Sequence, residues 1–358
     1  MSFHEFLGNA EAVNHLRRLI AEGRMDRTVI LAGPEGVGKT TLAVMAGLAL
    51  NCQNPPEPGD FCGACSSCTA FAGMDAIAEK IEQAREYRDQ EVKSRAKELA
   101  PLNVDLHPQI RLYPPDGDFL SIHQARAVIH HSQLQPDPGR TWTLILPDFD
   151  QSRWLVQNAL LKTLEEPARH VSLIALVRNP LELLPTVRSR ALILHLSPLP
   201  EEQIVALLRQ RRPGDEAQLR LLARLSQGCP GKALQFDLAA FQKLRQEALQ
   251  LLRAAAAHGS LERVFVLTES LRSGKEKFDS LIEILYSVIQ DILYLNSGIP
   301  EAIRNADSVS ELRELSRDFS FDQLRFATGE LDQILAAARR NAHRSLALDA
   351  WVLRMAKS

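Results

Sequence analysis

The segment at residues 28–52, TVILAGPEGVGKTTLAVMAGLALNC, constrains the fold more than any other part of the sequence. Its first residues form a short β-branched run that predicts a strand, and residues 39–52 are largely apolar and predict a buried helix. Between them, Gly33 to Thr40 match the phosphate-loop pattern G-x-x-x-x-G-K-[ST]. A strand that leads through a glycine-rich turn into a helix is the context in which this pattern binds phosphate. We therefore predict an α/β domain with a nucleotide site at this loop.

Each residue type in the loop has a chemical reason to be there. Glycines let backbone N–H groups face phosphate oxygens, and the start of the helix adds a positive dipole. Lys39 would reach the β- and γ-phosphates, and Thr40 would hold Mg²⁺. The alternative is a glycine-rich turn without a ligand. The nucleotide-binding residues predicted in the loop are Gly33, Gly36, Gly38, Lys39, Thr40 and Thr41.

Strand-like and helix-like segments alternate through the first 200 residues. Such alternation is typical of a parallel sheet that is covered by helices on both faces. Short helices follow to residue 236, and helices rich in Leu and Ala continue to residue 357, with breaks near Gly259, Pro300 and Ser320. The predicted strands are 28–33, 109–115, 142–146 and 171–177, and the predicted helices are 10–24, 39–52, 75–100, 121–134 (with Ser121 as N-cap) and 151–166.

The strand at 142–146 ends without an expected acid. A P-loop protein that hydrolyses nucleotide normally has a carboxylate directly after this strand, where it serves Mg²⁺. Here the sequence continues Pro147-Asp148-Phe149-Asp150. Proline has no carboxylate and no backbone N–H. The sequence therefore predicts a site that can hold a nucleotide but cleaves it poorly.

Four of the five cysteines lie close together: Cys52 is followed after nine residues by Cys62-x₂-Cys65-x₂-Cys68. In a reducing compartment this crowding favours a metal over disulfides. Four thiolates can enclose one Zn²⁺ tetrahedrally and leave no position for substrate, so structural zinc is the first interpretation. An iron–sulfur cluster is the second, although the spacing departs from the ferredoxin runs, and disulfides are the third. Cys229 stands alone and is expected to be a small buried hydrophobe.

Composition limits the class of protein. The chain has 358 residues, a formal net charge of −2, 45% hydrophobic and 24% charged residues, as expected for two or three globular domains. The near-neutral charge gives no overall attraction to nucleic acid or to an anionic membrane. No apolar run approaches the ~18 residues needed to span a bilayer, and the first residues lack an apolar signal core. We therefore expect a cytoplasmic protein without membrane partners.

Several segments together resemble one protein family. They are the opening FLGNAEAVNHLRRLIAEGRMDRTVILAGPEGVGKTTLA, the cysteine cluster, NALLKTLEEP at 158–167 and LLPTVRSR at 183–190. These segments look like those of the bacterial clamp-loader AAA+ subunits, the γ/τ and δ′ subunits of DNA polymerase III. RRNAHRSLALDAWVLRM at 339–355 is similar to the end of the δ′ collar domain. The resemblance covers most of residues 1–236 and the last twenty.

The resemblance implies three domains. Residues 1–197 would form an α/β P-loop AAA+ domain with an inserted Cys₄ zinc module at about 52–68, a module that the family also carries. Residues 198–236 would form a small helical lid domain. Residues 237–358 would form an all-α C-terminal collar domain through which the subunits assemble.

The charged helix at about 75–100 departs from the family pattern. The family passes quickly from the last cysteine to a strand that begins His-Pro-Asp, and here that segment is His107-Pro108-Gln109. Twelve of residues 79–98 are charged. We therefore interpret this helix as an insertion that is solvated or faces a partner.

The family pattern also implies roles around the phosphate loop. In the family the partner strand ends in Asp-Glu-Ala-Asp or a close variant, so Pro147 stands for the first acid and Asp148 for the water-polarising Glu. A polar sensor residue is common near position 179, where Asn179 fits and Arg178 is unexpected. Lys232 stands where a sensor arginine is common, so Asp148 and Lys232 join the predicted nucleotide-binding residues.

Arg190 is the predicted contribution to catalysis. SRA at 189–191 aligns with the family's Ser-Arg-Cys motif, whose arginine reaches in trans to the γ-phosphate bound by a neighbouring subunit. A guanidinium offers bidentate contacts and stays charged. The alternative is a surface arginine that caps a helix end. Glu165 and Glu166 of the LEEP segment are expected to be structural or interface residues rather than general acids.

Three functions remain in competition at this stage. The first is a δ′-type subunit that assembles with γ/τ and δ subunits and helps place the sliding clamp on primed DNA, with zinc as a structural ion and ATP/Mg²⁺ as a doubtful substrate. The second is an active γ/τ-type ATPase, which would be expected to have a complete acid pair and a long C-terminal extension. The third is a stand-alone AAA+ interaction protein that uses nucleotide only as a structural ligand.

Overall fold

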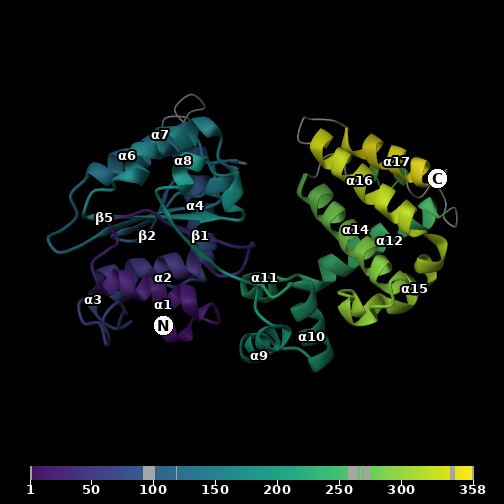
Figure 1. Ribbon diagram of the computed structural model, residues 1–358, viewed down its shortest axis with the longest axis horizontal. Coiled ribbons are helices and arrows are strands. Elements are labelled where there is room, and N and C mark those ends of the chain that lie inside the picture. Colours follow the sequence, from purple (N-terminus) through teal and green to yellow (C-terminus); the bar gives the residue numbers. More distant parts are fainter. Residues whose placement is uncertain are drawn as a thin grey trace. The chain divides into compact units, whose positions relative to one another are not determined.

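The chain divides into two units (Figure 1). The computed structural model describes residues 2–91, 101–117, 119–256, 265–266, 268–269, 275–338 and 343–356. The first unit is Met1–Pro200 with Gly228–Lys232, and the second unit is Glu201–Gln227 with Ala233–Ser358. The short segment Gly228–Lys232 thus belongs with the first unit although helices of the second unit precede it. A division of the second unit into lid and collar at residues 236 and 237 stays a prediction.

A six-stranded sheet forms the centre of the first unit, in the order β2-β3-β4-β5-β1-β6. Strand β1, which leads into the phosphate loop, lies between β5 and β6. From β3 to β6 the neighbouring strands are parallel, so their carboxyl ends meet at one edge, where ligands bind in open α/β sheets. The strands are β1 (Val29–Ala32), β2 (Val104–His107), β3 (Ile110–Leu112), β4 (Trp142–Leu146), β5 (Val171–Val177) and β6 (Leu192–His195).

The expectation of a parallel sheet is wrong at one edge, because β2 runs antiparallel to β3. Only Pro108 and Gln109 separate the two strands, and a connection this short can join antiparallel strands only. Neither β2 nor β6 is predicted from the sequence. Both are four residues long, and in β2 the exposed Asp105 interrupts the apolar residues. The sheet is therefore mixed, and the predicted α/β class is confirmed.

Helices cover both faces of the sheet: α1 (Ala10–Ala21) and α2 (Lys39–Asn51) lie on one, and α6 (Ile122–Gln133), α7 (Trp154–Glu165) and α8 (Pro185–Arg188) on the other (Figure 1). The side chains of β1 alternate between the two layers. Val29 and Leu31 belong to the apolar cluster of α1 and α2, whereas Ile30 and Ala32 belong to the cluster of α7. All four are buried, which explains why β1 is apolar along its whole length.

The ends of these helices follow local signals. Ser121 caps α6 as predicted: its hydroxyl accepts from the backbone N–H of Gln124 at 3.2 Å, and the Gln124 side chain accepts from the Ser121 N–H at 2.9 Å. This reciprocal pair is a capping box. Helix α7 begins three residues later than predicted, because Phe149–Gln151 form the 3₁₀ turn η2 before it.

The charged segment predicted at about 75–100 begins as a helix, α4 (Ala76–Glu91), and the predicted residues 92–100 lie outside the described residues. Helix α4 is attached to the first unit beside β2. Ile77 is buried, Lys80 donates to the Asp105 carbonyl at 3.2 Å, and Arg88 pairs with Asp116 at 2.5 Å. These contacts fix one side of α4, while Tyr87 on the same helix is 69% exposed.

The second unit contains helices and no strands among its described residues. The expected breaks near Pro300 and Ser320 are confirmed, and the one near Gly259 lies outside the described residues. No helix in the described ranges combines the length and the apolar character needed to cross a membrane. Helix α11 (Pro230–Gln235) crosses the boundary between the two units. The main helices of the second unit are α9 (Glu201–Arg211), α10 (Glu216–Leu225), α12 (Leu238–Ala255), α14 (Lys275–Asn296), α15 (Val309–Asp318), α16 (Phe321–Ala338) and α17 (Arg344–Met355).

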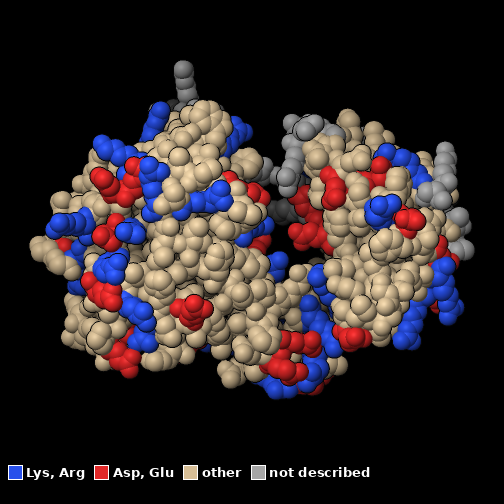
Figure 2. Space-filling model, in the orientation of Figure 1, with Lys and Arg blue, Asp and Glu red and all other residues tan. Residues whose placement is uncertain are grey.

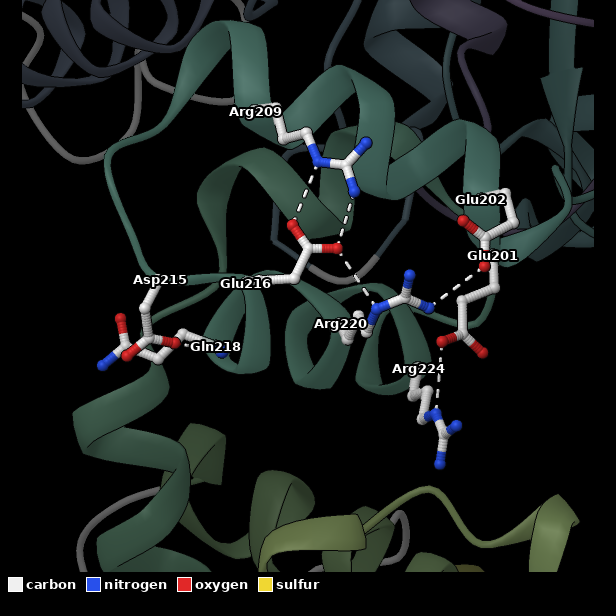
Figure 3. A network of polar contacts seen from close by, with 8 residues as sticks. All are labelled: Glu201, Glu202, Arg209, Asp215, Glu216, Gln218, Arg220 and Arg224. Carbon is white, nitrogen blue, oxygen red and sulfur yellow. Dashed lines mark hydrogen bonds and ion pairs between the residues drawn. The ribbon is translucent and has the colours of Figure 1, made fainter.

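Helices α9 and α10 are joined by a network of ion pairs (Figure 3). The pairs are Arg209–Glu216 at 2.6 Å, Arg220–Glu216 at 3.2 Å, Arg220–Glu202 at 3.1 Å and Arg224–Glu201 at 3.2 Å. Their side chains are at least 35% exposed, so the pairs add little stability. Figure 2 shows a similar mixture of acidic and basic side chains over the drawn face of each unit. The arginines of this network are therefore neutralised and do not form a basic surface.

A buried polar network crosses the core of the second unit. Arg245 of α12 is 3% exposed and contacts both carboxylate oxygens of Asp307, at 2.6 and 2.5 Å. Arg245 also donates to the Asn305 side chain at 3.1 Å, and Asp291 of α14 accepts from the Asn305 N–H at 2.8 Å. Burial would raise the pKa of Asp307, but the hydrogen bonds from Arg245 outweigh it and lower that pKa. The network thus joins α12 and α14 to the loop before α15.

Arg245→Met should destabilise the second unit by about 3 kcal/mol, the lower end of the cost of removing one partner from a buried pair. Because the pKa of Asp307 is lowered on folding, the pair stabilises above the unfolded pKa of about 4, and the effect of the mutation should shrink as the pH falls below it. Urea unfolding followed by Trp351 fluorescence, with Trp142→Phe and Trp154→Phe in the background, measures this.

The exposed pair Arg325–Asp322 provides the control, since its side chains are 75% and 84% exposed. Arg325→Met should change the free energy of unfolding by no more than about 0.5 kcal/mol. Equal effects of the two substitutions would contradict a structural role for the Arg245 network.

Candidate functional site

At its glycines, the backbone of the phosphate loop lies very close to the backbone of other segments. A Cβ at Gly33 would lie 2.4 Å from the Leu196 carbonyl oxygen, which follows β6. At Gly36 it would lie 2.8 Å from the backbone nitrogen of Lys232, and the Gly231 N–H donates to the Gly36 carbonyl at 2.8 Å. Only glycine fits these places, so β6 and the segment 228–232 fix the shape of the loop.

Lys39 begins α2 and points back along the loop. Its ammonium donates to the carbonyls of Gly33 at 2.6 Å and Pro34 at 2.9 Å. Burial lowers the pKa of Lys39, Asp148 opposes this shift and the Arg178 guanidinium adds to it. The side chain is therefore held within the loop, and the acids and the arginine that follow β4 and β5 act on it.

Asp148 does not extend freely from the end of β4. Its backbone is left-handed, with φ 47°, a conformation that Asp tolerates better than most residues. Its carboxylate lies 3.5 Å from the Nε of Arg178, and Arg178 Nη2 lies 2.9 Å from Glu35 of the phosphate loop. Arg178 thus bridges the phosphate loop and the acid that follows β4, a contact that sequence reasoning missed.

The Asp150 carboxylate accepts hydrogen bonds from the backbone. It is 5% exposed, and its Oδ2 accepts from the N–H groups of Arg178 at 2.8 Å and Asn179 at 2.9 Å. Its Oδ1 is buried and has no hydrogen-bond partner among the described residues. The Asn179 side chain accepts from the Leu181 N–H at 3.0 Å and so caps the turn that follows. Both side chains shape the end of β5.

The side chains around the phosphate loop suit a bound phosphate group better than a magnesium ion. The cations near the loop are Lys39, Arg178 and Lys232, of which Lys232 is exposed. Mg²⁺ needs carboxylate or water ligands in near-ideal octahedral geometry. Pro147 offers none, Asp148 is paired with Arg178, and the free oxygen of Asp150 is out of contact with solvent. Thr40 and Thr41, half-buried in the first turn of α2, supply hydroxyls, and since a P-loop hydroxyl at Thr40 can bind Mg²⁺, the ligand that this site lacks is an available carboxylate.

Arg190 follows α8 and its side chain is 45% exposed. Its Nε pairs with Glu165 at 2.6 Å, and its Nη1 donates to the Thr186 carbonyl at 3.1 Å. Glu165, the last residue of α7, is therefore the partner of this arginine within the same chain. The ion pair is exposed on both sides, so breaking it costs little.

The four clustered cysteines come together in space. The Sγ atoms of Cys52, Cys62, Cys65 and Cys68 all lie within 4.8 Å of one another, and no disulfide joins them. A tetrahedral Zn–S distance of ~2.3 Å places sulfurs ~3.8 Å apart, so the group fits one zinc ion after a small contraction. Cys229, by contrast, is buried apart from the cluster, as predicted.

The backbone around the cysteines favours thiolates. The N–H groups of Ala64 and Cys65 donate to the Cys62 sulfur, at 3.5 and 3.2 Å, and lower the pKa of Cys62. Burial would raise the pKa of Cys65, but backbone donors, first that of Cys68, lower it to about 6. Burial raises the pKa of Cys52 and Cys68. The backbone donors thus favour the thiolates of Cys62 and Cys65, and a bound cation would favour those of Cys52 and Cys68.

His107 connects the cysteine module to the sheet and is a second residue whose role was missed. It is 3% exposed and ends β2. Its Nδ1 accepts from the Gln109 N–H at 3.0 Å, so its Nε2 carries the proton and donates to the Ser67 carbonyl at 2.9 Å. Burial lowers the pKa of His107 and keeps it neutral. Ser67 directly precedes Cys68, so His107 fixes the last cysteine relative to the sheet.

Asp60 provides the other attachment of the module. It is 1% exposed and accepts from the N–H groups of Phe61 at 2.8 Å and Phe3 at 3.4 Å. Arg17 of α1 lies 3.6 Å from Asp60 and 2.7 Å from Glu57. His4, Glu57 and Asp60 also form a cluster of possible metal ligands, but Arg17 already pairs with both of its carboxylates. The cluster therefore serves to hold the module against α1.

Two sequence models of known families match the chain. One, described as DNA polymerase III, delta subunit, matches residues 8–200, and the other, described as DNA polymerase III, delta subunit, C terminal, matches residues 239–357. The tau subunit of DNA polymerase III from Escherichia coli (strain K12) is 27% identical over 240 residues, which are 65% of this chain and 32% of that one. The chain thus spans about a third of the length of this relative.

Solved structures give more distant likenesses. A DNA polymerase III gamma subunit-related protein from Thermotoga maritima is 18% identical, with a TM-score of 0.49, over 96% of this chain and 98% of that one. The Bacillus subtilis DNA clamp loader delta protein is 12% identical, with a TM-score of 0.31, over 96% of this chain and 99% of that one.

Proposed function

Because the chain belongs to the DNA polymerase III delta subunit family, we propose that it is a clamp-loader subunit of the δ′ type. In this proposal it has little or no ATPase activity of its own. It assembles with γ/τ and δ subunits, helps to place the sliding clamp on primed DNA, and provides Arg190 to the nucleotide site of a neighbouring subunit. The cysteine module binds one structural zinc ion.

The observation that carries the proposal is that the acids expected directly after β4 are replaced or paired. Hydrolysis of ATP needs a metal ion that neutralises the charge developing on the phosphates, and a base that orients water. The first acid position is Pro147, and Asp148, the second, is paired with Arg178 at 3.5 Å. The phosphate loop is complete, but the residues that would activate water on the bound nucleotide are replaced or already paired.

Zinc would be held by Cys52, Cys62, Cys65 and Cys68, and with four thiolates it has no open position for a substrate. The ion would supply folding energy to a module of few apolar residues.

Assembly is assigned to residues 237–358, since the second family model matches 239–357. The described residues of the second unit form helices and no strands, which supports this assignment, and the proposed partners are those of the family.

The isolated chain should hydrolyse ATP no faster than its own Lys39→Ala variant, because the acids needed for catalysis are missing or paired. Pro147→Asp should not restore turnover, since Asp148, a shorter acid than the family's water-polarising Glu, lies beside the Arg178 guanidinium. Steady-state phosphate release from the purified chain, with and without primed DNA, measures both. A wild-type rate more than tenfold above that of Lys39→Ala would overturn the δ′ proposal.

The alternative is an active γ/τ-type subunit. Its support is specific: the E. coli tau subunit is 27% identical over 240 residues, and the phosphate loop matches its pattern fully. The same ATPase measurement separates the two functions. A γ/τ-type subunit would show a metal-dependent rate that Lys39→Ala abolishes.

A further inference from the structure

Arg178 occupies an unusual place beside the phosphate loop. It follows directly after the last residue of β5, and β5 is the parallel neighbour of β1. Its backbone N–H is held by Asp150 at 2.8 Å, whereas its side chain is 47% exposed. The backbone is therefore fixed while the guanidinium can change partners. Its present partners are Glu35 at 2.9 Å and Asp148 at 3.5 Å.

We propose that Arg178 supplies the positive charge that Mg²⁺ supplies in hydrolytic P-loop sites, so that this pocket binds the di- or triphosphate of a nucleotide without a divalent metal. The proposal uses the P-loop pocket of the proposed function but does not depend on the δ′ assignment. Lys39 and Arg178 would share the phosphate charge, and the backbone N–H groups of the loop would bind the oxygens.

Moving the Arg178 guanidinium from Glu35 to a bound phosphate costs little free energy. The contact with Glu35 is an exposed ion pair, with side chains 47% and 60% accessible, and such pairs are weak. A phosphate offers the guanidinium two parallel hydrogen bonds and more negative charge than one carboxylate. Arg178 would therefore leave Glu35 for the phosphate, and its Asp148 contact would keep it near the loop.

The same geometry has a rival interpretation, in which the Arg178–Glu35 pair is a latch that closes the loop against nucleotide. The two interpretations predict opposite effects of removing the arginine. If Arg178 is a ligand, Arg178→Ala weakens binding. If it is a latch, Arg178→Ala strengthens binding. The substitution keeps the backbone N–H that Asp150 holds, so the end of β5 should stay intact.

The test is equilibrium binding of fluorescent ADP and ATP analogues to the full chain, in excess Mg²⁺ and in excess EDTA. The wild type should bind with dissociation constants that agree within about threefold in the two conditions. Arg178→Ala should weaken binding in EDTA about 10- to 100-fold, as expected for the loss of charge-assisted hydrogen bonds. Glu35→Gln should strengthen binding, because it releases the guanidinium.

Arg169→Ala is the matched control, since Arg169 is an exposed arginine that precedes β5 at the opposite end of the same strand, roughly 20 Å away. It should bind nucleotide as the wild type does. Loss of wild-type binding in EDTA, tighter binding by Arg178→Ala, or no binding in either condition would each overturn the proposal. The δ′ function would survive those results, because it rests on Arg190 and on the weak ATPase.

Discussion

Cys65→Ser is expected to abolish zinc binding, from about one ion per chain to none, because three thiolates cannot complete the tetrahedron. Apparent binding energies of structural zinc reach about 10–16 kcal/mol, and this energy is folding energy. The module should therefore unfold locally. Elemental analysis measures the ion, and amide hydrogen exchange measures the module, where the Gln109 N–H bonded to His107 and the Phe61 N–H bonded to Asp60 should lose protection.

Serine is a well-matched replacement at this position. The Cys65 side chain also caps the short helix α3 (Ser66–Thr69), since it accepts from the Cys68 N–H, and serine is a good N-cap. The cap is thus kept while the metal ligand is lost. Cys229→Ala, outside the cluster, should retain the full zinc content. A wild-type chain that contains no zinc, or that contains iron with sulfide, would contradict the assignment.

Arg190→Ala should lower ATP hydrolysis at the neighbouring subunit's site by about 10³- to 10⁵-fold, the range of arginine fingers supplied in trans. The fold should not change, because the side chain is 45% exposed and its polar contacts among the described residues are with the neighbouring Glu165, Thr186 and Ser189. Arg190→Lys should restore only part of the rate, since a point charge does not reproduce the bidentate contact. Single-turnover hydrolysis in the complex with γ/τ and δ subunits measures this.

Glu165→Gln is the control for the finger. It removes the ion pair of 2.6 Å but leaves the guanidinium, so hydrolysis should stay within a few-fold of the wild type. If Glu165→Gln were as harmful as Arg190→Ala, the pair would be a structural contact of this chain, and Arg190 would not act in trans. Unchanged assembly of both variants by gel filtration must accompany the comparison.

Local signals in the sequence predict much of the first unit. Strands β4 and β5 have the predicted bounds, because each is a largely apolar run, interrupted by one hydroxyl residue, that ends at turn residues. The phosphate loop, the Ser121 cap and the cysteine cluster are equally local. Strand β2 was missed because four residues with an exposed Asp105 carry too little pattern.

The partners of the charged side chains could not be predicted from local pattern. Arg178 meets Glu35 only because β5 pairs with β1 in a particular register, and the two residues are far apart in the sequence. The contact of His107 with Ser67 and the pair of Arg190 with Glu165 have the same origin. Such contacts depend on the strand order, which the sequence alone does not state. They also bear on the chemistry, since Arg178 pairs with Asp148, the first acid after β4.

The comparison of two variants in the reconstituted complex tests the central claim most directly. We propose that this chain contributes an arginine finger to a neighbouring subunit and does not itself drive ATP hydrolysis. DNA- and clamp-stimulated ATP hydrolysis should therefore fall strongly with Arg190→Ala. It should change little with Lys39→Ala, which removes a phosphate ligand from this chain's own site. The opposite order, with Lys39→Ala abolishing hydrolysis and Arg190→Ala leaving it unchanged, would mean that this chain is itself a motor.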